Sequence, residues 1–159
     1  GVGTYSGSFR EVSPYRNKFT FNADLGYGRW LDQTNGAYVR LSNLTAQRRG
    51  EHNQSIHSLQ AGYMLNVKSA ITGESTESDV FQLTTLLGAS MNVATRSGHG
   101  PTYAPGLQAA VQAGVRVAPQ VEIYLEPSVA AFGKTIERSH NSYPVEAMAK
   151  LSLGTKISF

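Results

Sequence analysis

The chain has 159 residues, a hydrophobic content of 40% and a formal net charge of +3, so it has the size of one domain and too little charge to indicate a nucleic-acid partner by itself. Cysteine is absent, which excludes a disulfide framework and thiolate metal sites. The mean hydropathy of −0.27 and the lack of a run of about 18 apolar residues argue against a membrane-spanning helix.

The predicted elements are strands. The first dozen residues are rich in Gly and Ser and barely alternate; we count them as a strand only because a closed barrel made by one bacterial chain needs an even number. Seven later segments alternate between apolar and polar residues with the period of two that a strand requires. In chain order they are Lys18 to Leu31, Gly36 to Arg48, His57 to Ala70, Phe81 to Thr95, Gly106 to Ala118, Val121 to Gly133 and Val145 to Phe159.

The last predicted strand shows the alternation most clearly. Leu151 and Leu153 point one way, whereas Lys150 and Lys156 point the other. This pattern is typical of a transmembrane barrel with a lipid-facing outside and a wet interior, and hydropathy misses such barrels because half of each strand is polar. A water-soluble lipocalin-like barrel that binds an apolar ligand is the alternative, since it would turn the same apolar stripe inward. The many charges assigned to the interior, the terminal Phe159 and the strand lengths favour the membrane barrel.

The predicted connections differ in length at the two ends of the strands. Tight turns near Gly36 and Pro119 alternate with long polar segments, as in outer-membrane barrels with short periplasmic turns and longer extracellular loops. Ser69 to Asp79 falls at the short-turn end, yet it is long for a turn and no sequence feature explains it. Nothing marks a second domain, so we predict a single barrel domain over residues 1–159. The predicted long loops are Ala46 to Ile56, Arg96 to Pro105 and Lys134 to Pro144.

The hairpin that joins Gly106–Ala118 to Val121–Gly133 predicts specific contacts. A symmetric turn places Arg116 opposite Glu122, and we expect these two residues to form an ion pair in the interior. The same register places Gln112 opposite Glu126.

The segment from Gly106 to Val129 resembles small outer-membrane β-barrel proteins of the Bacteroidetes, eight-stranded barrels of the OmpA and OmpX type. It carries their Tyr-x-Glu-Pro signature at Tyr124 to Pro127, and the chain ends with their Gly-x-x-x-x-Phe at Gly154 to Phe159. The resemblance implies an eight-stranded antiparallel up-and-down transmembrane β-barrel in the bacterial cell outer membrane. Because these proteins differ in function, it implies fold and location better than activity.

Two local features of the resembling half are also informative. Pro127 cannot donate to a strand ladder, so it marks either a strand end or a bulge near a barrel rim. The final strand looks like the signal that the barrel assembly machinery reads, although Thr155 departs from the pattern at one position. The residues of this predicted assembly signal are Leu151, Leu153, Ile157 and Phe159.

Charged residues of both signs fall on the predicted inner face. The interior of an eight-stranded barrel is just wide enough for side chains to fill, so we expect these charges to pair and to close it, because unpaired buried charges are costly. A gated path for small solutes is the alternative. The predicted lumen charge network is Asp24, Arg40, Arg116, Glu122, Glu126, Lys150 and Lys156, and Lys68 and Glu146 also fall on this face.

No residue pattern indicates catalysis. The histidines His52, His57, His99 and His140 match no metal-ligand or hydrolase spacing, and we predict no catalytic, metal or cofactor site. We expect a non-enzymatic envelope protein that serves as a structural element, a surface interaction protein or a subunit of a larger outer-membrane complex. A lipid-modifying outer-membrane enzyme is a further alternative.

Basic residues gather near the ends of the predicted long loops. The outer leaflet presents phosphates and anionic sugars, so we predict contacts with outer-membrane lipid and lipopolysaccharide there; a merely solvated loop surface is the alternative. Other predicted partners are the barrel assembly machinery during biogenesis and other outer-membrane proteins, with no nucleic acid. The predicted lipopolysaccharide contacts are Arg48, Arg49, Arg96, Lys134 and Arg138.

Overall fold

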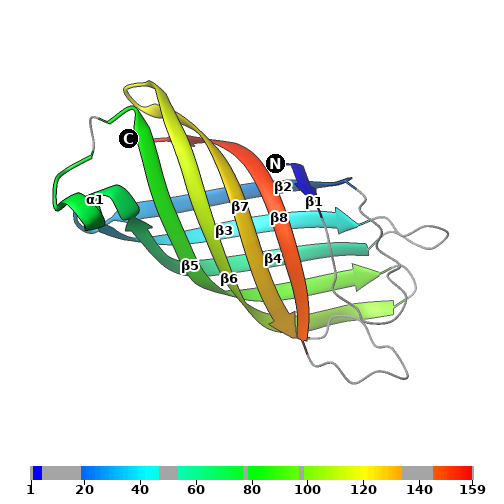
Figure 1. Cartoon of the computed structure of the whole chain (residues 1–159). Helices are drawn as coiled ribbons and strands as arrows, with labels where there is room; N and C mark the ends of the chain where they lie inside the picture. The colour runs from blue at the N-terminus through cyan, green and yellow to red at the C-terminus, as the bar shows by residue number, and fades with distance from the viewer. Residues whose placement is uncertain are drawn as a thin grey trace.

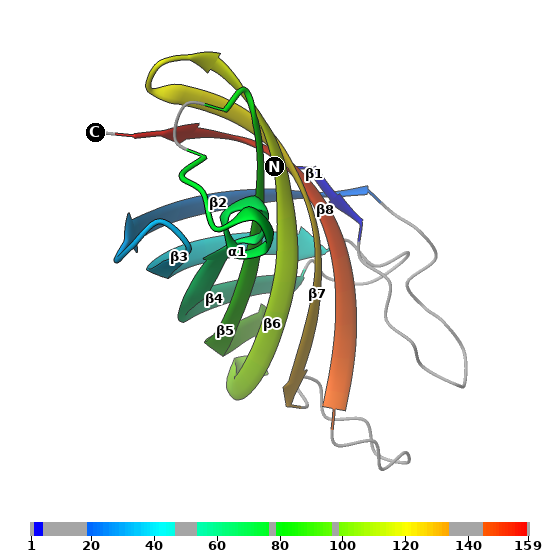
Figure 2. The same cartoon turned by 60° about the vertical axis from the view of Figure 1, so that its left-hand side comes forward.

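The computed structural model describes residues 2–4, 19–46, 54–76, 79–96, 99–133 and 145–158. These residues form an antiparallel up-and-down sheet in which each strand pairs with the next one in the sequence. The sheet curves around a central space, as Figures 1 and 2 show from two sides. The strands are β1 (Val2–Thr4), β2 (Phe19–Trp30), β3 (Asn35–Ala46), β4 (Gln54–Asn66), β5 (Phe81–Arg96), β6 (His99–Ala118), β7 (Val121–Gly133) and β8 (Val145–Ile157).

The two faces of the curved sheet differ sharply in chemistry. Leu151, Leu153 and Val111 are exposed on the outer face, whereas Lys150 is 7% exposed in the interior. Period-two alternation places successive side chains on opposite faces, so the apolar residues of each strand lie together outside. A soluble carrier with an apolar interior would have the opposite arrangement, so the lipocalin-like alternative does not fit the side chains of the described strands.

The loop predicted from Arg96 to Pro105 is wrong. Strand β5 continues to Arg96 and β6 begins at His99, and these two residues pair across the hairpin. Glycine and proline around residues 98–105 suggested a loop, but the strand ladder continues through them. The other two predicted long loops contain residues 47–53 and 134–144, which lie outside the described part of the chain.

The strand predicted from His57 to Ala70 ends earlier, at Asn66, and a short helix, α1 (Val67–Thr72), follows it. Asn66 caps the helix by accepting a hydrogen bond from the backbone N–H of Ser69, and Gly73 ends it with a φ of 71°, a left-handed conformation that favours glycine. Lys68 therefore lies on an exposed helix and not in the interior. In the described ranges, no helix is both long and apolar enough to cross a membrane.

Pro127 lies inside β7 and marks neither a strand end nor a bulge. Its partner on β8 is Leu151, and the β6 register is the same on both sides of it, with Ala110 opposite Ser128 and Ala113 opposite Leu125. The Pro127 side chain is exposed on the outer face. The irregularity of the β6–β7 pair lies between Arg116 and Ala118, close to the hairpin turn.

Candidate functional site: the polar interior

The centre of the interior is an ion pair between Arg40 of β3 and Glu126 of β7. Arg40 donates two hydrogen bonds, from Nη1 to Oε1 at 2.5 Å and from Nη2 to Oε2 at 2.8 Å. Gln112 donates a third to Glu126 Oε2 at 2.6 Å, and the Arg40 guanidinium lies 5.7 Å from the centre of the Tyr38 ring. Arg40 is 7% and Glu126 1% exposed. A two-point contact of this kind holds both side chains in fixed orientations.

Two further ion pairs tie β8 to other strands. Lys150 Nζ lies 2.7 Å from Asp24 Oδ2, which joins β8 to β2. Lys156 Nζ lies 3.0 Å from Glu122 Oε2 on β7. Together with the central pair, these contacts involve six of the seven residues of the predicted lumen charge network.

The seventh member of that network is Arg116. It lies opposite Glu122, in the predicted register, but Glu122 makes its ion pair with Lys156. Lys156 is the register partner of Glu122 on β8. The carboxyl group of Glu122 lies over the backbone of Gly114 on β6, where a Cβ atom would collide with it. Glu122 thus has basic residues on both neighbouring strands, and the structure pairs it with the lysine.

Neutral polar side chains fill the interior toward the end where the predicted long loops lie. Asn92 donates hydrogen bonds to Ser90 and to the backbone carbonyl of Ala104, each at 3.1 Å, and accepts one from Ser58 at 2.5 Å. Phe132, with 3% exposure, is buried near this level. Buried polar groups are tolerable when they are hydrogen-bonded, so these contacts allow the space to fill.

Glycines leave room for large side chains in the narrow interior. Tyr38 of β3, Gly62 of β4 and Gly88 of β5 are consecutive partners across three strands. The Tyr38 hydroxyl lies above Gly88, at the place that a Cβ atom would need, and the Tyr124 ring lies in the same way against Gly154. Each ring therefore lies flat over the backbone of a neighbouring part of the wall.

A hollow of about 600 Å³ lies between the level of Arg40 and the short-turn end. Tyr38, Met64, Leu86 and Tyr124 contribute to its wall, and Lys156 adds a charge. A hollow of this size could hold a small molecule or several large side chains. It also reaches the edge of β2, because residues from both faces of that strand line it.

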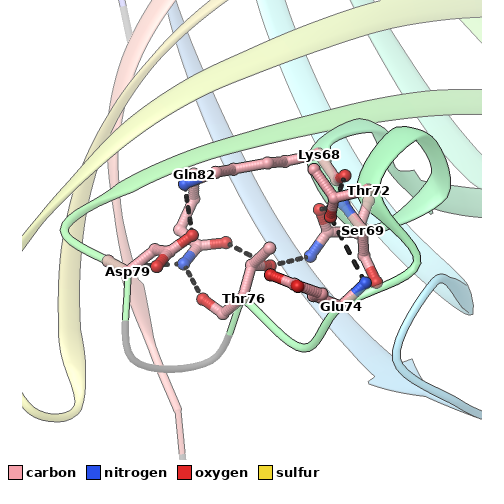
Figure 3. Close-up of polar contacts among 8 residues, drawn as sticks. Lys68, Ser69, Thr72, Glu74, Thr76, Asp79 and Gln82 are labelled. Carbon is pink, nitrogen blue, oxygen red and sulfur yellow. Dashed lines mark hydrogen bonds and ion pairs between the residues drawn. The ribbon is translucent and has the colours of Figure 1, made fainter.

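The β4–β5 connection forms a polar cap at the short-turn end (Figure 3). Asn66 donates to the Thr76 hydroxyl at 2.6 Å. Gln82 donates to the backbone carbonyls of Thr76 at 2.5 Å and of Asp79 at 3.1 Å. Asn66, Thr76 and Gln82 are buried, while Lys68 and Asp79 form an ion pair on the exposed side. The sequence analysis missed this cap, although an Asn seven residues before a Gly is a signal for a short capped helix.

The β2–β3 turn packs against the same cap. Asp32 accepts hydrogen bonds from the Asn35 side chain at 2.8 and 2.9 Å and from the backbone N–H groups of Thr34 and Asn35, each at 2.7 Å. These bonds stabilise the charged carboxylate and hold the pKa of Asp32 below its usual value. The Thr34 carbonyl accepts a hydrogen bond from the Asn66 backbone N–H at 2.7 Å. The turn and the cap thus form one connected unit.

Most of the predicted lipopolysaccharide contacts fall outside the described residues. Arg48, Arg49, Lys134 and Arg138 do so, and Arg96 is the last residue of β5. Of the predicted assembly signal, Leu151, Leu153 and Ile157 are exposed on the outer face of β8, while Phe159 is outside the described range.

The histidines do not form a site in the described part of the chain. His57 lies on β4 with its side chain exposed, and His99 begins β6. His52 and His140 lie outside the described residues. Across residues 19–46, 54–76, 79–96, 99–133 and 145–158, no three His, Asp or Glu side chains are grouped closely enough to hold a metal ion.

One solved structure is similar to this chain along nearly its whole length. It is the crystal structure of Neisserial surface protein A (NspA), with a TM-score of 0.71 and 15% sequence identity, and the match covers 99% of this chain and 92% of that chain. No protein-family model matches the sequence, and no curated protein sequence matches it. At this identity the similarity establishes the fold alone. The resemblance to proteins of the Bacteroidetes stays a prediction.

Proposed function

We propose that this chain is a non-enzymatic β-barrel of the bacterial outer membrane, that it acts as a structural or surface interaction protein of the cell envelope, and that its interior is closed to solutes. The observation that carries the proposal is the arrangement of side chains, with leucines and valines outside and paired charges inside. The similarity in fold to a protein named as a surface protein supports it. Closure of the sheet into eight transmembrane strands is part of the proposal.

Solvation energies favour hydrocarbon as the surroundings of the outer face. Leu25 is 74% exposed and Leu107 69% exposed, and burial of apolar surface is worth about 25 cal/mol per Å². In water, a sheet with this outer face would leave that free energy unused on strand after strand while it still buried Arg40 and Lys150. In a bilayer the outer residues are solvated by lipid, and the charges stay in the protected interior.

Closure of the interior follows from the paired charges. The Arg40–Glu126 pair crosses the interior from β3 to β7, and the Lys150–Asp24 pair joins β8 to β2. A path for ions would require one of these pairs to separate, which leaves an unpaired charge in a buried place. The cap around Asn66 adds a second obstruction at the short-turn end.

Membrane location and closure are tested separately. We expect the protein to sediment with outer membranes, to need detergent for extraction, and to migrate differently on gels before and after boiling. In planar bilayers we expect no large, stable conductance. A protein that stays soluble without detergent contradicts the membrane proposal, whereas steady large conductance contradicts closure and leaves the membrane proposal standing.

Lipopolysaccharide binding is a further part of the proposal. Its support is the placement of Arg96 at the end of β5 where the predicted long loops lie. The other four basic residues, Arg48, Arg49, Lys134 and Arg138, are included on sequence grounds. Replacement of all five by glutamate is expected to reduce co-purification with lipopolysaccharide, and unchanged co-purification of the folded variant would refute this contact.

A further inference from the structure

Strand β2 is exposed on both faces over much of its length. Side chains added at Gly26 and Gly28 would meet Arg40 and Met64, which are interior residues, so both glycines face the interior. They are nevertheless exposed, as are Leu25 and Tyr27 on the outer face. Strand β7 shows the regular alternation of buried and exposed residues that β2 lacks. Loss of alternation on one strand indicates that a neighbouring strand is missing beside it.

The missing neighbour is on the side of β2 that faces β8. Strand β1 pairs with Phe19 to Phe21 of β2 and also lies close to β8, so it sits between the two strands at one end. Within the described chain, no ribbon runs between the rest of β2 and β8 (Figure 2). We call the strip between Ala23–Trp30 of β2 and the end of β8 the open strip. It is one strand wide, because β1 fits at its end.

The open strip has the chemistry of a site for a β-strand. The outer edge of β2 presents backbone N–H and C=O groups there, and such an edge pairs readily with another strand. The inference shares with the proposed function the premise that hydrocarbon surrounds the outer face. In hydrocarbon, an open sheet edge has no water to satisfy its backbone groups, and open edges do not occur there.

We propose that the open strip binds an extended segment that continues β1 on its N-terminal side and runs antiparallel to both β2 and β8. Val2 is opposite Phe21 and Thr4 is opposite Phe19, so each step back from Val2 moves the partner one residue toward Trp30. About eight residues attached before Gly1 would therefore cover Ala23 to Trp30.

The shape of the open strip defines the side chains of this segment. Residues opposite Leu25 and Tyr27 face outward and are apolar, like their neighbours. Residues opposite Gly26 and Gly28 face the hollow of about 600 Å³ and carry large side chains, because glycine leaves room for a bulky partner. The segment thereby extends the wall and fills the hollow at the same time.

A strand from a second copy of the chain fits less well. Strand β1 already occupies the end of the open strip in register with β2. A foreign strand would have to stop at Val2 or displace β1, whereas a continuation of β1 meets neither obstacle. We therefore assign the strip to a segment of the same polypeptide.

The experiment adds an eight-residue extension to Gly1 of the full chain, with apolar residues opposite Leu25 and Tyr27 and large polar or aromatic residues opposite Gly26 and Gly28. A cysteine at the third residue before Gly1 is combined with Leu25→Cys, since these positions are opposite in the proposed register. The matched control moves the added cysteine to the fourth residue before Gly1, which faces the interior. A second control replaces two residues of the extension with proline.

We expect an intramolecular disulfide in the matched variant and little in the shifted control. Amide exchange at Ala23 to Trp30 should slow about tenfold or more with the alternating extension and remain unchanged with the proline extension. Equal cross-linking in both cysteine variants, or equal exchange with both extensions, would overturn the proposal, and disulfide-linked dimers would assign the strip to a second copy. Detergent extraction of the unextended chain tests the membrane proposal independently.

Discussion

Arg40 and Glu126 lie on strands that are not neighbours, and they are joined by two hydrogen bonds of 2.5 and 2.8 Å across the interior. The pair links residues 86 positions apart in the sequence. Because β3 and β7 share no ladder, this contact depends on the curvature of the whole sheet. It is therefore a sensitive reporter of whether the barrel wall has formed.

Replacement of Glu126 by glutamine tests this pair. The change leaves Arg40 charged and buried without its carboxylate, and we expect a loss of about 3–5 kcal/mol in the free energy of unfolding. The double variant Arg40→Met, Glu126→Leu should regain most of that loss, since neither charge remains. Urea unfolding of protein folded into lipid vesicles measures both. A cost below about 1 kcal/mol for Glu126→Gln would show that the pair contributes little.

Substitution on the outer face tests the direction of the side chains. Leu41 is 56% exposed near the middle of β3. Leu41→Arg should cost about 2–4 kcal/mol in vesicles if this position is near the bilayer midplane, and Leu41→Ala should cost less. In a water-soluble barrel the arginine would be tolerated at this exposed site. Equal stability of the Arg and Ala variants would contradict a lipid-facing Leu41.

Glycine substitution tests the close approach of the strands. A Cβ atom on Gly62 would collide with the backbone of Leu87 and Gly88, and backbone atoms in a paired strand cannot move aside. We expect Gly62→Ala to destabilise the protein by about 1–3 kcal/mol or more. Gly100→Ala is the control, because no atom lies within 4 Å of its added carbon. Similar unfolding curves for the two variants would refute the predicted collision.

The cap at the short-turn end predicts two separable losses at Asn66. Asn66→Ala removes both the helix cap and the hydrogen bond to Thr76, and we expect a loss of about 1–2 kcal/mol. Asn66→Asp keeps an acceptor for the Ser69 backbone N–H but cannot donate to Thr76, so its cost should be intermediate. Amide exchange at Ser69 distinguishes them, since protection should persist in the Asp variant and fall in the Ala variant.

The β2–β3 turn predicts a pH dependence. Folding lowers the pKa of Asp32, so its carboxylate stabilises the fold above the pKa of the unfolded chain, and this contribution is lost as the pH falls through the folded-state pKa. NMR titration should give a midpoint for Asp32 below the usual value. Asn35→Ala removes the largest stabilising contact and should raise that midpoint; an unchanged midpoint would exclude the Asn35 side chain as the cause.

Alternation along each strand made the wall of this fold predictable from the sequence. The predicted strand Val121 to Gly133 has the bounds of β7, and the outward leucines of β8 follow from its pattern. Helix α1 was not predicted, because its six residues are too few to show a helical period. The loop expected near Pro105 was wrong because glycine and proline outweighed a continuing ladder in that region.

Pairing across the interior was beyond the sequence. A hairpin rule places Arg116 opposite Glu122, but it cannot show that Lys156 on the other neighbouring strand takes the carboxylate. The Arg40–Glu126 contact depends on strand tilt and on how far the sheet curves, and neither quantity is encoded in local alternation. The sequence therefore identifies the charged members of the interior but leaves their partners open.

The Tyr38 ring, which reaches from β3 over Gly62 to Gly88, has a consequence for any transport through this molecule. A side chain that merely projected into a channel could swing aside within nanoseconds. This ring rests on the peptide backbone of two adjoining strands and has Arg40 beside it, so displacing it would uncover main chain and disturb a buried charge together. Permeation past this level would proceed at the slow pace of local unfolding, and not at that of a swinging gate.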